Sequence, residues 1–426
     1  MNQKSQNYAL PIAMMFALFF MISFVTGLQN PMGVIVKNQF AASNFMSQLG
    51  NAANFIAYAF MGLPAGMLLQ KIGYKKTALI AIAVGFIGVG ISFLSGQVES
   101  FAVYLAGAFI SGFSMCMLNT VVNPMLNTLG GGGNKGNQLI QLGGSLNSVG
   151  ATIVPVLVGY LIGGNVANAT IDSATPALLL AIGIFALAFI VLSLVTIPEP
   201  SLAIKSTEKA EHSPFAFRHF IFGVIAIFLY VGIEVGIPNV ANLFMTSGAG
   251  EGGLGIDPTV AGTIVGTYWF LMMCGRLVGA SIGAKVSSKT MLTCVSSVAI
   301  LFVLLAIFMP TTTTVSMPVF QSNISFGLAE VPIGIMFLII CGLCTSIMWG
   351  GIFNLAVEGL GKYTELASGI FMVMVCGGGI LPLIQGAAAD AFGFMSSYWV
   401  IVICLAFLLF YALVGSKNVN KDIPVE

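Results

Sequence analysis

The stretch GLPAGMLLQKIGYKKT, residues 62–77, joins two long apolar segments, and a related stretch returns in the second half of the chain. The second copy occupies residues 275–290, where GRLVG is followed by two lysines and a threonine. The first glycines of the two copies, Gly62 and Gly275, stand 213 residues apart. Two hydrophobic halves that carry the same glycine-rich, basic loop predict a two-lobed membrane transporter.

The composition of the chain points to the same environment. Hydrophobic residues make up 58% of the 426 residues and charged residues 7%, against roughly 25% charged residues in a soluble domain. So few charges cannot cover a globule in water, so we expect most of the surface to face lipid. A formal net charge of +1 argues against a nucleic-acid partner. The seven cysteines lie in apolar segments, where helix packing is a better interpretation than redox or zinc chemistry.

Apolar windows of about 20 residues, each able to cross ~30 Å of hydrocarbon, predict an all-α membrane protein with about twelve transmembrane helices in two pseudo-symmetric six-helix lobes. The expected windows lie near residues 11–36, 45–70, 77–95, 101–128, 138–164, 175–197, 218–246, 258–284, 290–309, 332–359, 366–389 and 396–415. The polar stretch 198–217 separates six windows from six. We therefore predict a first lobe at 1–197, a cytoplasmic linker at 198–217 and a second lobe at 218–426.

The distribution of charge predicts the orientation in the membrane. With an even number of spans, both termini lie on one side, and the loops on that side carry most of the lysines, among them Lys71, Lys75 and Lys76. Acidic residues predominate in the opposite loops. Because cytoplasmic loops are rich in Lys and Arg, both termini are expected in the cytoplasm.

Neutral amides gather in the predicted helices of the first half. Asn119 and Asn123 are four residues apart and so share one helix face. The amides that we expect to contact a substrate are Gln29, Asn30, Asn119, Asn123, Gln141 and Asn147. Amides donate and accept hydrogen bonds and therefore suit a ligand dense in hydroxyls, such as a sugar. The alternative is that some of them bond to other helices and only hold the bundle together.

The second half adds aromatic and charged candidates. Trp269 and Trp349 lie within predicted helices, where an indole face could stack on a sugar ring; an interfacial position is the alternative. Asn239 and Asn354 are further expected substrate contacts, the latter because the end of its window resembles the end of the window that holds Asn123. Glu234 is a candidate coupling acid, or a structural acid with a permanent partner.

The expected gating residues belong to the two copies of the repeated motif, and one of them, Arg276, lies deep in the window 258–284 near its cytoplasmic side. Arg276 opens the second copy of the repeated motif, and we expect it to form a gate or loop salt bridge rather than to bind substrate. Lys71, Lys75 and Lys76 belong to the first copy and are given the same gating or loop role. No metal site is expected.

At these residues the chain resembles the fucose–galactose–glucose:proton symporter family of the major facilitator superfamily, over essentially its full length. The similar stretches are LQNP at 28–31, MLNTVVNP at 117–124, LNSVGA at 146–151, YVGIEV at 230–235 and VEGLG at 357–361. The last two look most like the glucose/galactose members. The resemblance implies the major facilitator fold and transport of a monosaccharide.

Two departures from the family pattern concern coupling. Fucose–proton members carry an aspartate at the position that matches Asn30 and a glutamate at the position that matches Asn119. An asparagine side chain does not titrate, so proton coupling at these positions is in doubt, whereas the amides could still bond to sugar hydroxyls. Gly143 and Gly144 stand where the family tends to have polar residues, which leaves the identity of the sugar open.

The expected function is ion-coupled import of a hexose by alternating access, without enzymatic activity. A proton or sodium ion is the expected coupling ion, and no other cofactor is expected. The partners are a small sugar and the lipid bilayer, and we expect a monomer in the inner membrane of a bacterium. A sugar uniporter and a multidrug exporter of the same fold are the alternatives.

Overall fold

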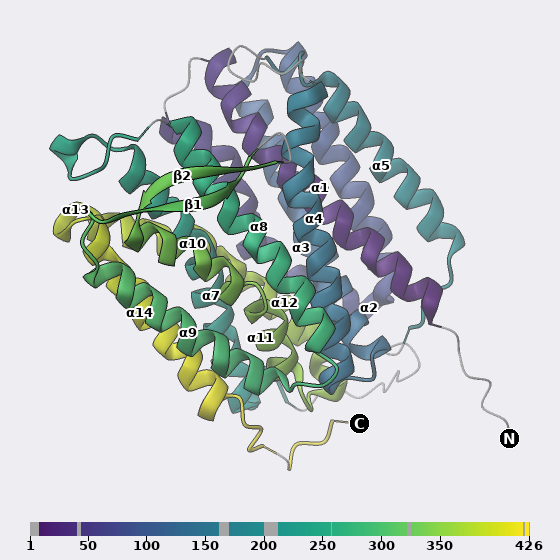
Figure 1. Cartoon of the computed structure of the whole chain (residues 1–426). Coiled ribbons are helices and arrows are strands. Elements are labelled where there is room, and N and C mark those ends of the chain that lie inside the picture. Colours follow the sequence, from purple (N-terminus) through teal and green to yellow (C-terminus); the bar gives the residue numbers. More distant parts are fainter. Residues whose placement is uncertain are drawn as a thin grey trace, which may run out of the picture.

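The computed structural model describes residues 8–40, 44–161, 170–199, 212–256, 258–321, 325–420 and 422–425. The first lobe contains α1 Ala9–Gln39, α2 Asn44–Gln97, α3 Phe101–Leu129, α4 Gly133–Leu161 and α5 Thr175–Leu194. The second lobe contains α7 Arg218–Thr246, α8 Pro258–Ile282, α9 Ser288–Phe308, α10 Ile333–Thr345, α11 Met348–Val357, α12 Thr364–Val373, α13 Gly377–Phe392 and α14 Phe394–Phe410 (Figure 1). Most of the predicted linker, residues 200–211, lies outside the described residues.

The first copy of the repeated loop bends α2 sharply at Gly73. This residue has φ of 84°, a conformation that glycine adopts without a steric penalty. The carboxylate of Glu199, just beyond α5, accepts hydrogen bonds from the backbone nitrogens of Tyr74 at 2.7 Å and Lys75 at 2.8 Å. A Cβ at Gly73 would collide with that carboxylate. The loop therefore ends one span, starts the next and ties both to the end of α5.

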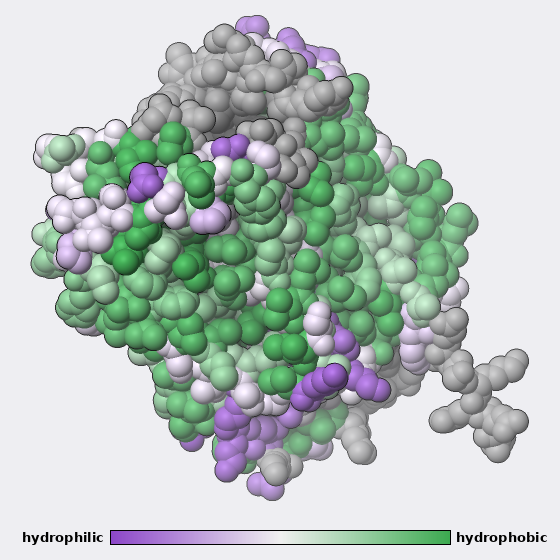
Figure 2. Space-filling model, in the orientation of Figure 1, coloured by the Kyte–Doolittle hydropathy of each residue, from purple (hydrophilic) through white to green (hydrophobic). Residues whose placement is uncertain are grey.

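The helices account for the twelve predicted spans. Ten helices in the described part of the chain are long and apolar enough to cross a membrane. One of them, residues 52–97, is 46 residues long and holds two spans because of its bend. The more polar α4 has 29 residues, also enough to span. Figure 2 shows an apolar surface over the middle of the molecule, so the predicted fold class is confirmed.

Two spans of the second lobe are broken. The predicted window 332–359 forms α10 and α11, which are separated at Ser346 and Ile347. The window 366–389 forms α12 and α13, with a 3-10 turn at Met374–Cys376 between them. Breaks inside a membrane protein occur where the backbone is buried in protein or lines a cavity. Both breaks lie at the cavity described below.

A β-hairpin between α9 and α10 was not predicted. Strands β1 Thr314–Phe320 and β2 Phe326–Pro332 pair antiparallel, at the end of the molecule opposite the C-terminus (Figure 1). The hairpin packs on α8: the backbone nitrogen of Phe320 donates to Thr267 Oγ1 at 2.9 Å. The rings of Phe270 and Phe320 stack with centroids 4.7 Å apart. The hairpin thus supports the outer half of α8.

The two lobes meet most closely at the end where α1 begins and α14 finishes, here called the terminal end. There α2 packs on α12, and a Cβ added to Gly66 would lie 2.8 Å from the Cα of Gly369. Small residues let helix backbones approach in this way. Nearby, Gln138 on α4 donates to the carbonyl of Ala280 on α8 at 3.1 Å. The lobes are therefore closed together at the terminal end.

Candidate functional site

A cavity of about 240 Å³ lies between the two lobes. Its walls come from α1, α2, α3 and α4 of the first lobe, and from α7, α8, α11 and the breaks before α11 and α13 of the second. Polar groups from both lobes converge on it, including Asn119, Asn147, Glu234 and Arg276. An interlobe cavity with a few convergent polar groups is the default candidate for a substrate site.

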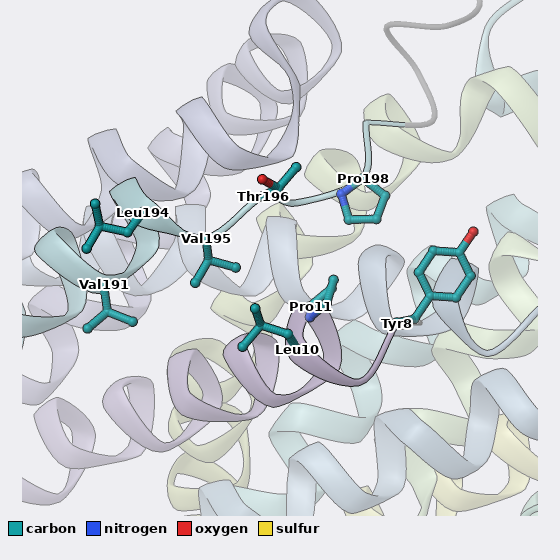
Figure 3. A pocket seen from close by; sticks show the side chains of 8 residues that line it. All are labelled: Tyr8, Leu10, Pro11, Val191, Leu194, Val195, Thr196 and Pro198. Atoms are coloured by element: carbon teal, nitrogen blue, oxygen red, sulfur yellow. The ribbon is translucent and has the colours of Figure 1, made fainter. Parts of the chain in front are cut away.

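Two other hollows lie on the outside of the first lobe. The larger, about 560 Å³, lies between the start of α1 and the end of α5 (Figure 3). It is lined by Tyr8, Leu10, Pro11, Val191, Leu194, Val195, Thr196 and Pro198. The other, about 370 Å³, has only apolar lining residues from α2 and α5. Neither hollow has a charged side chain in its wall, so the interlobe cavity remains the candidate site.

The wall of the first lobe is neutral and rich in hydrogen-bonding groups. Asn119 Nδ2 donates to the hydroxyl of Tyr58 at 2.8 Å and to the carbonyl of Met115 at 3.1 Å. Asn147 and Thr152 also line the cavity from α4. Asn119 Oδ1 accepts a long bond from Asn123 Nδ2 at 3.5 Å and keeps a second lone pair. The structure thus places the predicted residues Asn119 and Asn147 in the wall of the cavity.

The wall of the second lobe carries a buried ion pair. Arg276 Nη2 lies 3.2 Å from Glu234 Oε1, and the two side chains are 12% and 15% exposed. The hydroxyl of Tyr268 donates to the backbone carbonyl of Glu234 at 3.2 Å. Of the two roles expected for Arg276, a gate or a loop salt bridge, the structure places its salt bridge in the cavity wall, with a partner 42 residues away on α7, and leaves the role of a gate open. Charges at this depth are costly unless they are paired.

Aromatic rings complete the second wall. Trp349 makes edge contacts with Tyr230 and Phe371, at centroid distances of 6.3 and 6.0 Å. Trp269 also lines the cavity and is 36% exposed. The ring of Trp269 contacts that of Tyr268 edge-on, at a centroid distance of 5.3 Å, and its exposed part offers an apolar face for a ligand.

Two of the predicted amides bond across the lobes. Gln141 Nε2 donates to the carbonyl of Ile347 at 2.8 Å. Asn123 is fully buried, and its Oδ1 accepts from Trp349 Nε1 at 3.1 Å. Gln141 still lines the cavity, but Asn123 is not among the lining residues. For Asn123, the alternative interpretation of an amide that holds the bundle together fits this conformation.

Two further residues that were predicted to contact substrate lie away from the cavity in this conformation. Asn239 is exposed and does not line the cavity. Asn354 is buried within the second lobe, where its Nδ2 donates to Ser288 Oγ at 2.9 Å. The sequence matched Asn354 with Asn123, but Asn123 bonds to the other lobe through Trp349, whereas Asn354 bonds to Ser288 of its own lobe.

The remaining predicted residues lie in α1 and in the repeated loop. Gln29 and Asn30 belong to α1, but their side chains lie outside the described part of the structure. Lys75 Nζ donates to the carbonyl of Ser193 at 2.9 Å, at the terminal end. Lys71 and Lys76 are exposed, and none of the three lysines lines the cavity.

Several residues at or near the lobe interface were not predicted. Tyr58 and Ser148 line the cavity, and both were detectable in principle as polar groups within apolar windows. Glu365, 6% exposed in the first turn of α12, is a further buried acid that falls one residue before its predicted window. No group of three or more His, Cys, Asp or Glu in the described residues could hold a metal ion.

Comparison with known proteins identifies the family. The domain of the Major Facilitator Superfamily matches residues 15–381. A glucose/galactose transporter of Brucella abortus is 31% identical over 433 residues, which cover 98% of this chain and 97% of that protein. The L-fucose-proton symporter of Escherichia coli is 23% identical and covers 98% and 96% of the two chains.

Solved structures show the same fold. The crystal structure of the transporter FucP in the outward conformation matches with a TM-score of 0.80 at 20% identity, over 96% of this chain and all of that one. The proton:xylose symporter XylE matches with a TM-score of 0.68 at 13% identity, over 96% of each chain. The chain belongs to the Major Facilitator Superfamily, in the family of the glucose/galactose transporters and L-fucose-proton symporters.

Proposed function

We propose that this protein is a secondary-active transporter that imports a neutral hexose of the glucose and galactose class by alternating access. The observation that carries the proposal is the interlobe cavity. Its volume, about 240 Å³, is below the ~300 Å³ at which pockets for drug-sized ligands begin. A cavity of this size favours one monosaccharide over a larger sugar.

The chemistry of the cavity wall supports a neutral sugar. Asn119, Asn147 and Thr152 offer donors and acceptors from the first lobe, and Trp269 offers an apolar ring face from the second. The Glu234–Arg276 pair has no net charge, so an anionic or cationic ligand would find no uncompensated partner there. A multidrug exporter would be expected to have a more apolar cavity.

The names of the relatives support the same substrate class. The protein of Brucella abortus is called a glucose/galactose transporter, and that of Escherichia coli an L-fucose-proton symporter. Both match this chain over nearly their whole length. We propose that the chain transports its substrate without converting it, and that one chain is sufficient, because one chain forms the whole cavity.

We propose that the protein lies in the inner membrane of a bacterium with both termini in the cytoplasm. Lys71, Lys76, Lys285 and Lys289 are exposed in the repeated loops at the terminal end, as expected for cytoplasmic loops. In this orientation the terminal end, where the lobes are closed, faces the cytoplasm.

For coupling, we propose that Glu234 exchanges a proton or helps to hold a sodium ion, and that no other cofactor is required. Glu234 is a carboxylate in the cavity wall, while asparagines stand at the two positions where the family has acids. The alternative is a uniporter, which is favoured by the ion pair of Glu234 with Arg276, because a permanently paired acid need not titrate.

The proposal is tested by uptake into proteoliposomes. Purified protein is reconstituted and offered labelled glucose, galactose, fucose, xylose and a disaccharide, with no ion gradient, a proton gradient or a sodium gradient. We expect uptake of a hexose, no uptake of the disaccharide, and accumulation above equilibrium with one of the two gradients. Uptake that equilibrates but never accumulates would support the uniporter. Binding of none of the sugars would overturn the proposed substrate class.

A further inference from the structure

Arg276 contacts both lobes at once. Within its own lobe, Nη2 bonds to Glu234 Oε1 and Nε donates to the carbonyl of Ser346, each at 3.2 Å. Toward the first lobe, Nη1 donates to the carbonyl of Gly144 at 3.2 Å and to Ser148 Oγ at 2.6 Å. One guanidinium group therefore connects α7 and α8 to α4.

The bonds to α4 belong to a row of contacts that closes the lobes. Along the same helix, Gln138 donates to the carbonyl of Ala280 and Gln141 to the carbonyl of Ile347. Arg276 differs from both glutamines because it is charged, and hydrogen bonds to charged groups are stronger than those between neutral groups. These bonds cross between lobes, so they must break when the lobes separate at the terminal end.

The position of Arg276 makes its bonds to the first lobe exchangeable. Arg276 and Ser148 both line the cavity, so a bound ligand can reach the guanidinium group. Arg276 has donors only and needs oxygen acceptors. A sugar hydroxyl is such an acceptor and can replace Ser148 Oγ or the carbonyl of Gly144. Meanwhile Glu234 stays with Arg276 in its own lobe, so the cation is not left unpaired when it leaves α4.

We propose that Arg276 is a substrate-released latch, which holds α4 through Ser148 and Gly144 in the empty carrier and lets go when a neutral polyol in the cavity takes over its donors. The release half of this inference rests on the proposed function. The closing half does not, because it concerns the carrier without substrate. The latch would couple occupation of the cavity to the opening of the terminal end.

The test measures the separation of the lobes directly. Fluorophores are attached to the full-length protein in nanodiscs at positions 76 and 285, one in each lobe, through noncanonical amino acids that leave the native cysteines in place. Single-molecule energy transfer then gives the ratio of molecules open to molecules closed at the terminal end. The same sample is measured without sugar, with D-glucose and with D-galactose.

The key variant is Ser148→Ala, which removes one acceptor in the first lobe and leaves the Glu234–Arg276 pair in place. Its matched control is Ser145→Ala on the same helix, because Ser145 is buried and its hydroxyl donates within α4, to the carbonyl of Gln141 at 2.9 Å. Without sugar we expect the open-to-closed ratio to rise about tenfold or more in Ser148→Ala and to stay near the wild-type value in Ser145→Ala. Arg276→Lys, which keeps the charge but loses the fork of donors, should shift the ratio in the same direction.

The outcomes separate the latch from the substrate. An unchanged ratio in both Ser148→Ala and Arg276→Lys without sugar would overturn the latch. With sugar, the wild type should shift toward open and Ser148→Ala should shift less, because its latch is already weakened. Sugar that binds, as measured by calorimetry, but shifts both proteins equally would overturn release by substrate. If no sugar binds, the proposed function is contradicted. The latch is then tested by the open-to-closed ratios of the variants and the wild type without sugar.

Discussion

The two lobes share a repeated loop and a similar set of helices, but their cavity walls differ in chemistry. The first lobe presents neutral groups, with Asn119, Gln141 and Asn147 as its amides. The second lobe presents the Glu234–Arg276 ion pair and the ring of Trp269. Duplication therefore preserves the positions of helices, which packing requires, and leaves the side chains that face the cavity free to differ.

The difference suggests a division of labour between the lobes. In lipid, a charge is tolerated only where it has a partner, and the second lobe supplies both partners of the pair. The first lobe supplies hydrogen-bonding groups without charge, among them Asn119. We expect changes in the first lobe to affect sugar affinity, and changes at the ion pair to affect energy coupling.

The largest expected effect tests coupling at the ion pair. Glu234→Gln should abolish accumulation of sugar against a gradient and leave sugar exchange intact, because the loaded carrier can still reorient while net accumulation needs the ion step. Counterflow and gradient-driven uptake in the same proteoliposomes separate the two processes. Asp390→Asn, at an exposed acid of α13, is the matched control and should behave like the wild type.

Glu234→Gln also leaves Arg276 without its partner, and this alone could abolish accumulation of sugar. An unpaired buried charge is strongly destabilising, so the double variant Glu234→Gln/Arg276→Gln, which removes both charges, should be more stable than the single variant. Accumulation should stay lost in the double variant. If Glu234→Gln protein still concentrates sugar, the acid is structural and the two lobes do not differ in the way proposed.

The next effect concerns affinity in the first lobe. Asn119→Ala removes an amide that lines the cavity and leaves the Tyr58 hydroxyl without its partner. We expect sugar binding to weaken by about 1–3 kcal/mol, which is about 5- to 150-fold in Kd. Asn354→Ala is the control, because it removes an equally buried amide outside the cavity. It should lower stability and leave Kd unchanged; equal losses of affinity in both variants would show a general effect of folding.

A smaller loss of affinity is expected at the ring of Trp269. Trp269→Leu keeps an apolar side chain but removes the flat face, and we expect sugar binding to weaken by about 0.5–1.5 kcal/mol. Trp399→Leu is the control, because Trp399 is exposed and packs against Phe308 on the outside of the second lobe. Sugar-dependent quenching of tryptophan fluorescence should disappear in the first variant only. Quenching that survives in Trp269→Leu would place the ring contact at Trp349.

Sequence reasoning predicted the helices well because apolar windows and the repeated loop reflect the lipid surroundings directly. The bend at Gly73, for example, lies inside the repeated stretch. The pairing of Glu234 with Arg276 was not predicted, since it depends on how α7 packs beside α8. The amides were identified as important, yet composition could not separate Asn119 in the cavity from Asn123 or Asn354, which bond to protein groups.

The hairpin and the broken helices were missed for a different reason. Residues 310–331 lie between the expected windows 290–309 and 332–359, and a search for apolar windows long enough to span a membrane does not detect strands of seven residues. The break between α10 and α11 falls inside a continuous apolar window, and hydrophobicity does not report a change of direction there. Both features have tertiary contacts that a sequence window does not contain. Thr267 and Phe270 of α8 hold β1, and the carbonyls at the break, those of Ser346 and Ile347, accept from Arg276 and Gln141.

The smallest expected effect tests whether the hairpin matters for the second wall. Thr267 lies two residues before Trp269 on α8, and Thr267→Val removes the acceptor for the backbone nitrogen of Phe320. We expect a loss of about 0.5–1.5 kcal/mol in stability, measured as a lower thermal transition in detergent. Thr263→Val, one turn earlier and bonded only to the carbonyl of Val260 within α8, should change less. Because the Phe270–Phe320 stack remains to hold the hairpin, sugar affinity should stay within about twofold in both variants. A loss of affinity as large as that of Trp269→Leu would mean that the hairpin orients Trp269. The wall of the second lobe would then depend on a β-hairpin, and the described part of the first lobe contains no strand that could act in the same way.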